Sequence, residues 1–178
     1  MAEIRPLTTA DARPCWEHLR RMVWESGRDG DFIFSPTEAF EAPFEEFEKS
    51  FPAKLEKAVT EAGWERAWVI AEDGGFYGEL RLVHRPPLKS CLHRALLMMG
   101  IERTHRGRGF GPALMQEALT WAKAQPSLEW LQLFVFEGNH PAKKLYRKFG
   151  FQENGTTPDM FRVHGNQVDD TSMILKLR

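Results

Sequence analysis

The chain has 178 residues, of which 42% are hydrophobic and 28% charged, and its formal net charge is −1. This length suits one domain with a sizeable core, so we expect a single domain over residues 1–178. The charge balance argues against a nucleic-acid partner, and no apolar run reaches the roughly 18 residues that a membrane span needs. Cys15 and Cys91 lie far apart, without a CxxC or a nearby His pair, so we expect a reducing compartment, no disulfides and no metal site. Because residues 1–14 lack the apolar segment of a signal peptide, we expect a cytoplasmic protein without a membrane partner.

The charges are distributed unevenly along the sequence. Residues 25–61 hold ten acidic and four basic side chains, whereas residues 85–108 hold six basic and one acidic. Such runs usually form solvated faces. A second interpretation places an anionic cofactor at the basic segment and a cationic substrate at the acidic one.

The first third of the sequence predicts helices and a loop. Residues 8–25 begin with capping residues and carry an apolar face at helical spacing. Residues 26–36 are rich in Gly, Asp, Ser and Pro, which predicts a loop. Regular spacing over residues 36–62 predicts further short helices, which Pro43 and Pro52 are expected to interrupt.

After residue 65 the hydrophobic period changes to that of strands. An Asp-Gly-Gly turn and a later Gly-Asn turn each separate two such segments. Strands are predicted over residues 66–72, 76–84, 94–101, 128–136, 160–164 and 170–177, and helices over 110–124 and 139–149. Strands that alternate with helices predict a mixed α/β sheet.

Residues 103–114, RTHRGRGFGPAL, combine three arginines with three glycines at alternate positions. They lie between a predicted strand and a predicted helix, where the first helical amides are unpaired and the helix dipole is positive. Glycines let an anion approach such a turn closely, so the segment predicts a phosphate site. Pro112 breaks the spacing of both a P-loop and a Rossmann fingerprint. A disordered RNA-binding segment and a tight turn with incidental arginines are the alternatives.

Two segments together resemble the signature of the GNAT superfamily of acyl-CoA-dependent N-acyltransferases. Arg106-x-x-Gly109-x-Gly111 is similar to its R/Q-x-x-G-x-G/A turn, and residues 139–151 (NHPAKKLYRKFGF) are similar to its N-x-x-A-x-x-L-Y-x-x-x-G-F segment. The resemblance implies an α/β (α+β) fold with a mixed, mostly antiparallel sheet of about six to seven strands. Helices would cover both faces of this sheet, which would be splayed at its central strands.

The resemblance also implies acetyl-CoA as co-substrate and no metal. Its pyrophosphate would lie on the backbone amides of residues 106–111, and its pantetheine arm would pair with residues 101–103 like an added strand. A bulge near Ile101, which Gly100 would accommodate, would aim the Ile101 amide at the thioester oxygen. The implied cofactor-binding residues are Ile101, Glu102, Arg103, Arg106, Gly107, Arg108, Gly109, Phe110, Gly111, Asn139 and Tyr146. The family often has Ser, Thr or a basic residue where this chain has Pro112, which donates no hydrogen bond.

Tyr146 matches the tyrosine of the family, and the resemblance implies that its phenol protonates the departing CoA thiolate. The alternative is that Tyr146 only packs in the helix stripe beside Leu145. For the general base, Glu79 on an interior strand is one candidate, and an ion pair with Arg81 on the same face is the alternative for it. Glu102 or a chain of waters are the other candidates for the base.

The sequence therefore predicts an N-acetyltransferase that moves an acetyl group from acetyl-CoA to a primary amine by direct attack in a ternary complex. The alternative is a module of the same fold that senses acyl-CoA or recruits partners without turnover. The acidic residues 25–61 suggest a cationic acceptor such as a polyamine, an aminoglycoside or a basic peptide. Arg81 suggests instead an acceptor with a carboxylate, such as an amino acid. Many family members dimerise, so a homodimer is also considered.

Overall fold

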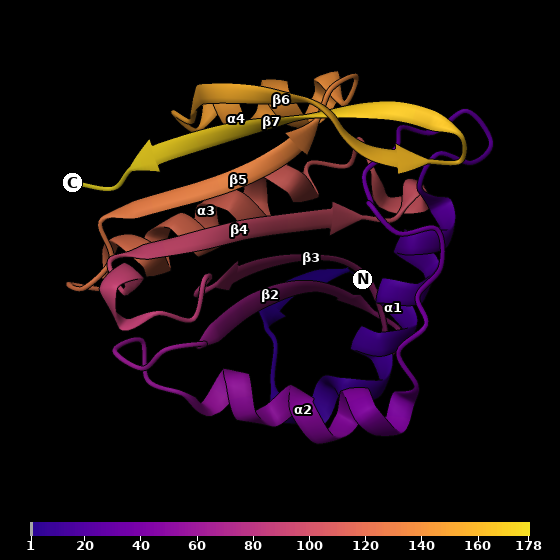
Figure 1. Cartoon of the computed structure of the whole chain (residues 1–178). Helices are drawn as coiled ribbons and strands as arrows, with labels where there is room; N and C mark the ends of the chain where they lie inside the picture. The colour runs from indigo at the N-terminus through magenta and orange to yellow at the C-terminus, as the bar shows by residue number, and fades with distance from the viewer. Residues whose placement is uncertain (1) are drawn as a thin grey trace.

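A computed structural model describes residues 2–178, and a seven-stranded sheet forms its centre (Figure 1). The strands are β1 (Glu3–Pro6), β2 (Glu65–Glu72), β3 (Gly75–Val83), β4 (Arg94–Ile101), β5 (Trp130–Phe136), β6 (Gln152–Val163) and β7 (Asn166–Lys176). The α-helices are α1 (Ala12–Glu25), α2 (Phe44–Glu56), α3 (Phe110–Lys123) and α4 (His140–Lys148). The strand order is β1-β2-β3-β4-β5-β7-β6, and only β4 and β5 are parallel neighbours. The predicted mixed, mostly antiparallel sheet is confirmed.

Alternation of side chains along the strands divides the interior into two cores. Ile70, Leu80 and Leu82 point to one face, where they pack with α3 and with Tyr146 of α4. Val69 points to the other face, in a smaller core with residues of α1 and α2. Helices therefore cover both faces of the sheet, as predicted, with α3 and α4 opposite α1 and α2.

The two central strands separate along their length. β5 pairs with β4 only from Arg94 to Leu96, and Figure 1 shows the two strands moving apart toward their arrowheads. The pairing of β3 with β4 is continuous through Ile101, so the bulge expected near Ile101 is not found in that pairing. The splay follows from the early end of the β4–β5 pairing.

Several segments differ from the sequence-based prediction. β1 was not predicted, and no helix forms over residues 57–62. Residues 36–43 form no helix, and α2 continues through Pro52 without interruption. Proline removes the hydrogen bond to the carbonyl four residues earlier, but Glu48 is exposed and its carbonyl has access to water. β6 begins eight residues earlier than predicted, at Gln152, because this edge strand is exposed and lacks an apolar alternation.

Within residues 2–178 the structure contains no helix with the length and apolarity that crossing a bilayer requires.

The core formed by β2, β3 and α3 should dominate stability. Leu82→Ala removes a side chain that is 0% exposed, and we expect it to lower the free energy of unfolding by about 2–5 kcal/mol. Leu88→Ala is the matched control, because Leu88 is 54% exposed and its truncation should cost at most about 0.5 kcal/mol. Urea denaturation measures both, and equal losses would contradict this assignment of the core.

Candidate active site

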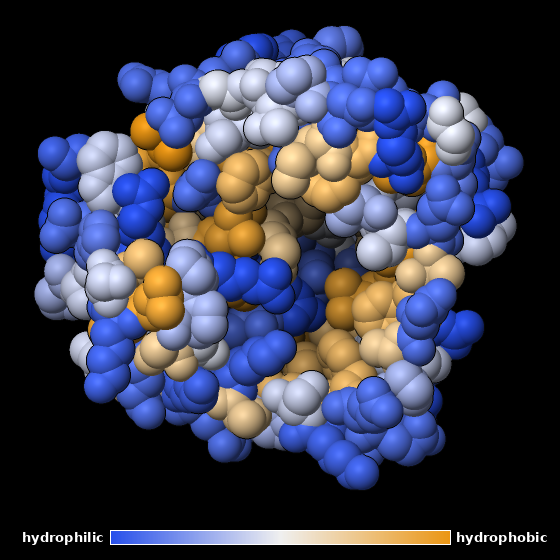
Figure 2. Space-filling model, in the orientation of Figure 1, coloured by the Kyte–Doolittle hydropathy of each residue, from blue (hydrophilic) through white to orange (hydrophobic). Residues whose placement is uncertain are grey.

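A cavity of 490 Å³ lies where β4 and β5 diverge. Its lining comes from α1 and residues 32–34, from the turn over residues 106–112, and from α4. Figure 2 shows the face of the molecule presented in Figure 1 hollowed near its centre, with apolar and polar side chains around the hollow. The separation of two strands thus places helix, loop and turn residues around one space.

The turn after β4 supplies unpaired backbone amides to this cavity. Gly107 and Gly109 have φ angles of 72° and 85°, which glycine adopts without steric cost. The amides of residues 107–111 have no hydrogen-bond acceptor within the described chain. Gly111 packs closely against α4, because a Cβ there would lie 3.2 Å from Cδ2 of Leu145 and this side chain would have to shift. Free amides at the first turn of α3 fit the pyrophosphate of acetyl-CoA.

Two of the three arginines in this segment are bound by acidic side chains of the loop after α1. Arg106 donates through Nη1 to both carboxylate oxygens of Asp31, at 2.6 and 2.5 Å. Arg103 lies 3.5 Å from Asp31 and donates to the carbonyl of Arg28. Arg108 is exposed to solvent. The acidic and basic runs of the sequence therefore partly neutralise each other, and the backbone amides remain the main anion donors of the turn.

The backbone amide of Ile101 points into the gap between β4 and β5. Glu102 donates its backbone N–H to the carbonyl of Tyr77 at 2.9 Å. Successive residues of an antiparallel strand point their backbone groups to opposite sides, so the N–H and C=O of Ile101 point toward β5. The Ile101 carbonyl accepts a 2.7 Å hydrogen bond from Nε of Arg106, while its N–H faces the widening gap.

Tyr146 reaches the cavity from α4 and is 5% exposed. Its hydroxyl has no hydrogen-bond partner among residues 2–178, and burial raises the pKa of Tyr146 to about 12. The phenol is therefore protonated at neutral pH and free to donate. Asn139 also lines the cavity, and its Oδ1 accepts the amide of Ala142 at 3.3 Å as a helix cap.

The predicted cofactor-binding residues divide into two groups. Those that line the cavity are Ile101, Arg106, Gly107, Gly109, Gly111, Asn139 and Tyr146. Glu102, Arg103, Arg108 and Phe110 lie outside this lining. Pro112 contributes to the lining, but it has no N–H to donate.

Glu79 belongs to a buried ionic cluster on the α1 side of the sheet. Arg81 donates to both oxygens of Glu79, at 2.8 and 2.6 Å, and also to Glu65 and to Sγ of Cys15. Burial by itself raises the pKa of Glu79, but the Arg81 guanidinium outweighs it and holds that pKa below its ordinary value. The same-face ion pair that the sequence offered as an alternative is therefore present, and Glu79 is outside the cavity lining.

A second buried pair was missed by the sequence reasoning. His18 on α1 is 0% exposed, and its Nδ1 lies 2.6 Å from Oε1 of Glu102. Arg21 adds a hydrogen bond of 3.0 Å to the same oxygen. Nε2 of His18 is buried without a partner in the described chain. Met22, one turn after His18, and Ile101, next to Glu102, both line the cavity, so the pair lies close to the cavity although neither member is part of its lining.

The comparisons with known proteins identify the family. Residues 34–151 match the model of the acetyltransferase (GNAT) family. The chain therefore belongs to the GNAT family, and the resemblance noted in the sequence is confirmed.

Individual relatives match over part of their length. YwnH of Bacillus subtilis, provisionally named as a phosphinothricin acetyltransferase, is 34% identical over 63% of this chain and 61% of its own. The L-amino acid N-acetyltransferase AaaT of Escherichia coli is 32% identical over 57% of this chain and 62% of its own. The chain thus aligns with about three fifths of each of these relatives.

A solved structure shows the same fold over nearly the whole chain. It is a phosphinothricin acetyltransferase of the GNAT superfamily from Sinorhizobium meliloti in complex with acetyl-CoA. The TM-score is 0.79 at 19% identity, with 98% of this chain and 88% of that chain covered.

Removing the central cation of the ionic cluster should make stability strongly pH-dependent. Arg81→Leu leaves the carboxylates of Glu79 and Glu65 buried without their partner, and we expect a loss of about 3–5 kcal/mol near pH 7.5. In the wild type the lowered pKa of Glu79 contributes stability above the ordinary pKa of Glu, which is lost as the pH falls. In the variant this contribution is absent, and burial without Arg81 favours the protonated form of Glu79. The loss in free energy of unfolding relative to the wild type should therefore become smaller toward pH 5. Urea denaturation across this range measures it, and a constant deficit would contradict the ionic role.

Proposed function

We propose that this chain is an acetyl-CoA-dependent N-acetyltransferase, acting as one domain over residues 1–178 on a primary amine. The observation that supports this most is the set of free amides over residues 107–111, at a cavity that also receives a buried, protonated Tyr146. A thioester that carries phosphate groups requires anion donors and a proton donor around one space. The acetyl-CoA complex of the structurally similar protein is consistent with this.

The chain would hold the co-substrate by its phosphates and present its thioester in the gap between β4 and β5. The turn amides bind the pyrophosphate, and the unpaired edge of β4 accepts the pantetheine amides. The Ile101 N–H stabilises the oxygen that becomes negative when the amine attacks. As the C–N bond forms and the C–S bond breaks, the thiolate takes the proton of Tyr146, which solvent restores after release.

The attacking amine must lose a proton, and Glu102 with His18 is the better placed acceptor. Glu79 is held on both oxygens by Arg81, so it is a weak proton acceptor. Glu102 is likewise held on both oxygens by Arg21, at 3.0 and 3.1 Å. The acceptor of this pair is therefore Nε2 of His18, which has no partner among residues 2–178, while Glu102 fixes the imidazole through Nδ1. Because this pair lies close to the cavity but outside its lining, we propose that a water connects it to the amine.

Tyr146→Phe tests the proposed acid. We expect kcat to fall by about a hundredfold or more, since general acid catalysis commonly contributes that much. Affinity for CoA, measured by calorimetry, should not change. The wild-type rate should show no basic limb from Tyr146 below about pH 10, because the pKa of this phenol is about 12.

Tyr77→Phe is the control, since Tyr77 stacks on His105 at 4.2 Å and is outside the cavity lining. An unchanged kcat for Tyr146→Phe at all pH values would show that the phenol is not the acid. CoA binding without thiol release over a broad panel of amines would favour a sensor or recruitment module.

His18→Gln tests the proton acceptor. We expect kcat/KM to fall by about tenfold or more, because the glutamine amide cannot accept the proton. His84→Gln is a matched control, because His84 is also buried, also has a free Nε2 and binds the amide of Gly63 at 2.9 Å. If both variants lost activity only in proportion to lost stability, the catalytic role of His18 would be wrong.

A further inference from the structure

The charged side chains beside the cavity are engaged with one another. Arg106 is the one charged side chain of the described residues that lines it, and Asp31 takes this guanidinium on both oxygens. Glu25 accepts from the backbone of Arg103 at 2.9 Å. Arg81, the candidate for binding a carboxylate, is held by Glu79 and is outside the lining. Neither charge pattern of the sequence therefore provides a free partner for a charged acceptor.

The side of the cavity that would receive the acceptor is apolar. On β5, Leu133 and Val135 point into the core of α3, so Phe134 points to the opposite face of the sheet, toward α1. Phe134 lines the cavity together with Phe32 and Met22. The turn over residues 106–112 and Tyr146 lie on the other face of the sheet. In the proposed reaction the thioester lies between this turn and the apolar side chains, so these side chains are where the acceptor would bind.

Two of these side chains remain partly open to solvent. Phe32 is 42% and Phe134 is 52% exposed, although both line the cavity. Burying such rings against a ligand is favourable, at about 25 cal/mol per Å² of apolar surface. A carboxylate against the same rings would lose water without gaining a partner. An ammonium would gain only a cation–π contact with a phenylalanine ring, which offsets part of the lost hydration.

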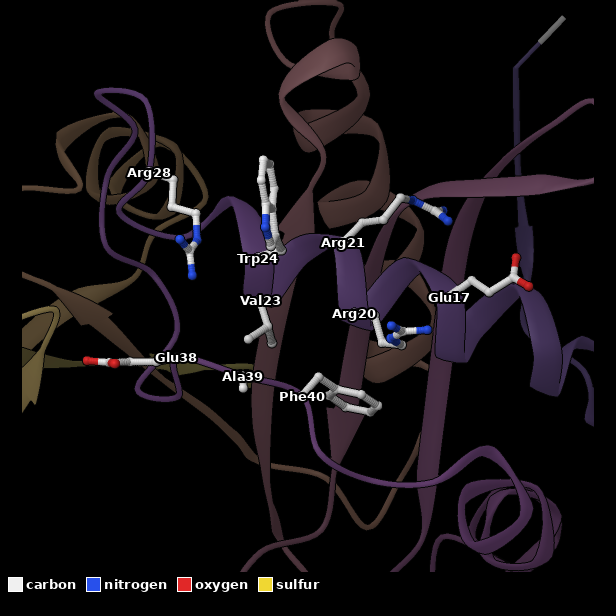
Figure 3. A pocket seen from close by; sticks show the side chains of 9 residues that line it. All are labelled: Glu17, Arg20, Arg21, Val23, Trp24, Arg28, Glu38, Ala39 and Phe40. Carbon is white, nitrogen blue, oxygen red and sulfur yellow. The ribbon is translucent and has the colours of Figure 1, made fainter.

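A second pocket offers a contrast. It lies on the outer side of α1, and Figure 3 shows Arg20, Arg28 and Trp24 on its wall. Trp24 is 58% exposed, as open as Phe134, but it does not line the cavity between β4 and β5. Arg20, Arg21 and Arg28 line this pocket together with Glu17 and Glu38, so charged side chains gather there and not on the apolar side of the cavity between β4 and β5.

We infer that the acceptor is a primary amine on an apolar carbon body, without a carboxylate or a second ammonium. The inference rests on the proposed function, because it names the acceptor for that reaction. Met22, Phe32 and Phe134 bind the body, and the amine nitrogen reaches the thioester between β4 and β5.

Matched amines test this acceptor class in a free-thiol assay with acetyl-CoA. Phenethylamine and phenylalanine differ by a carboxylate, and hexylamine and hexamethylenediamine differ by a second ammonium. We expect kcat/KM to be at least about tenfold higher for the member of each pair without the additional charge, because that charge would be desolvated without a partner of opposite charge.

A carboxylate placed among the apolar side chains of the cavity should reverse the preference for hexylamine over hexamethylenediamine. Phe134→Glu supplies a partner for the second ammonium, so the ratio of hexamethylenediamine to hexylamine should rise about tenfold or more. Trp24→Glu is the control at equal exposure, and it should leave the ratio unchanged. Circular dichroism verifies that both variants are folded.

The outcomes are distinguishable. A preference for phenylalanine or for the diamine in the wild type, or an equal shift in both variants, would overturn the acceptor class alone. Absence of thiol release with all four amines, while acetyl-CoA still binds saturably, would overturn the proposed function itself.

Discussion

The early end of the pairing between β4 and β5 is the constraint on which the site depends. After Leu96 the two strands have no hydrogen bonds to each other, so the backbone of β4 remains unpaired on that side up to Ile101. An edge of this kind inside a sheet must be covered or bound. The surrounding elements leave a cavity there instead of filling it. An unfilled cavity lowers the free energy of unfolding, which fits a site that a ligand occupies.

The loop after α1 forms one wall of this cavity without any regular secondary structure. Asp31 of this loop binds the guanidinium of Arg106. Glu25, at the end of α1, accepts a hydrogen bond from the backbone N–H of Arg103, and the two contacts hold the loop against the turn after β4. Ser26 adds hydrogen bonds of 2.9 Å to the amides of residues 34 and 35. Arg106, the first residue of the family motif, thereby connects the turn over residues 106–112 to the loop that forms the other side of the cavity.

Much of this molecule could be predicted from short-range patterns. The turn over residues 103–111 and the cap of α4 at Asn139 depend on glycine, proline and asparagine at fixed spacing, which the sequence displays directly. Pairings between distant residues could not be predicted in this way. His18 and Glu102 are 84 positions apart, and Arg106 and Asp31 are 75 apart. The ion pair of Glu79 with Arg81, two positions away, was among the alternatives that the sequence offered, but only the structure shows that it forms. It matters because ion pairing lowers the tendency of a carboxylate to accept a proton.

The close contact of Gly111 with Leu145 has a mechanical consequence. A Cβ at Gly111 would lie only 3.2 Å from Leu145, so even a methyl group between the first turn of α3 and α4 would displace this side chain. Close-packed interiors transmit displacement instead of absorbing it. Leu145 is the chain neighbour of Tyr146, so a displacement of the first turn of α3 would reach the helix that carries this phenol. If the turn binds the phosphates of the co-substrate as proposed, that binding and the position of the phenol would be coupled.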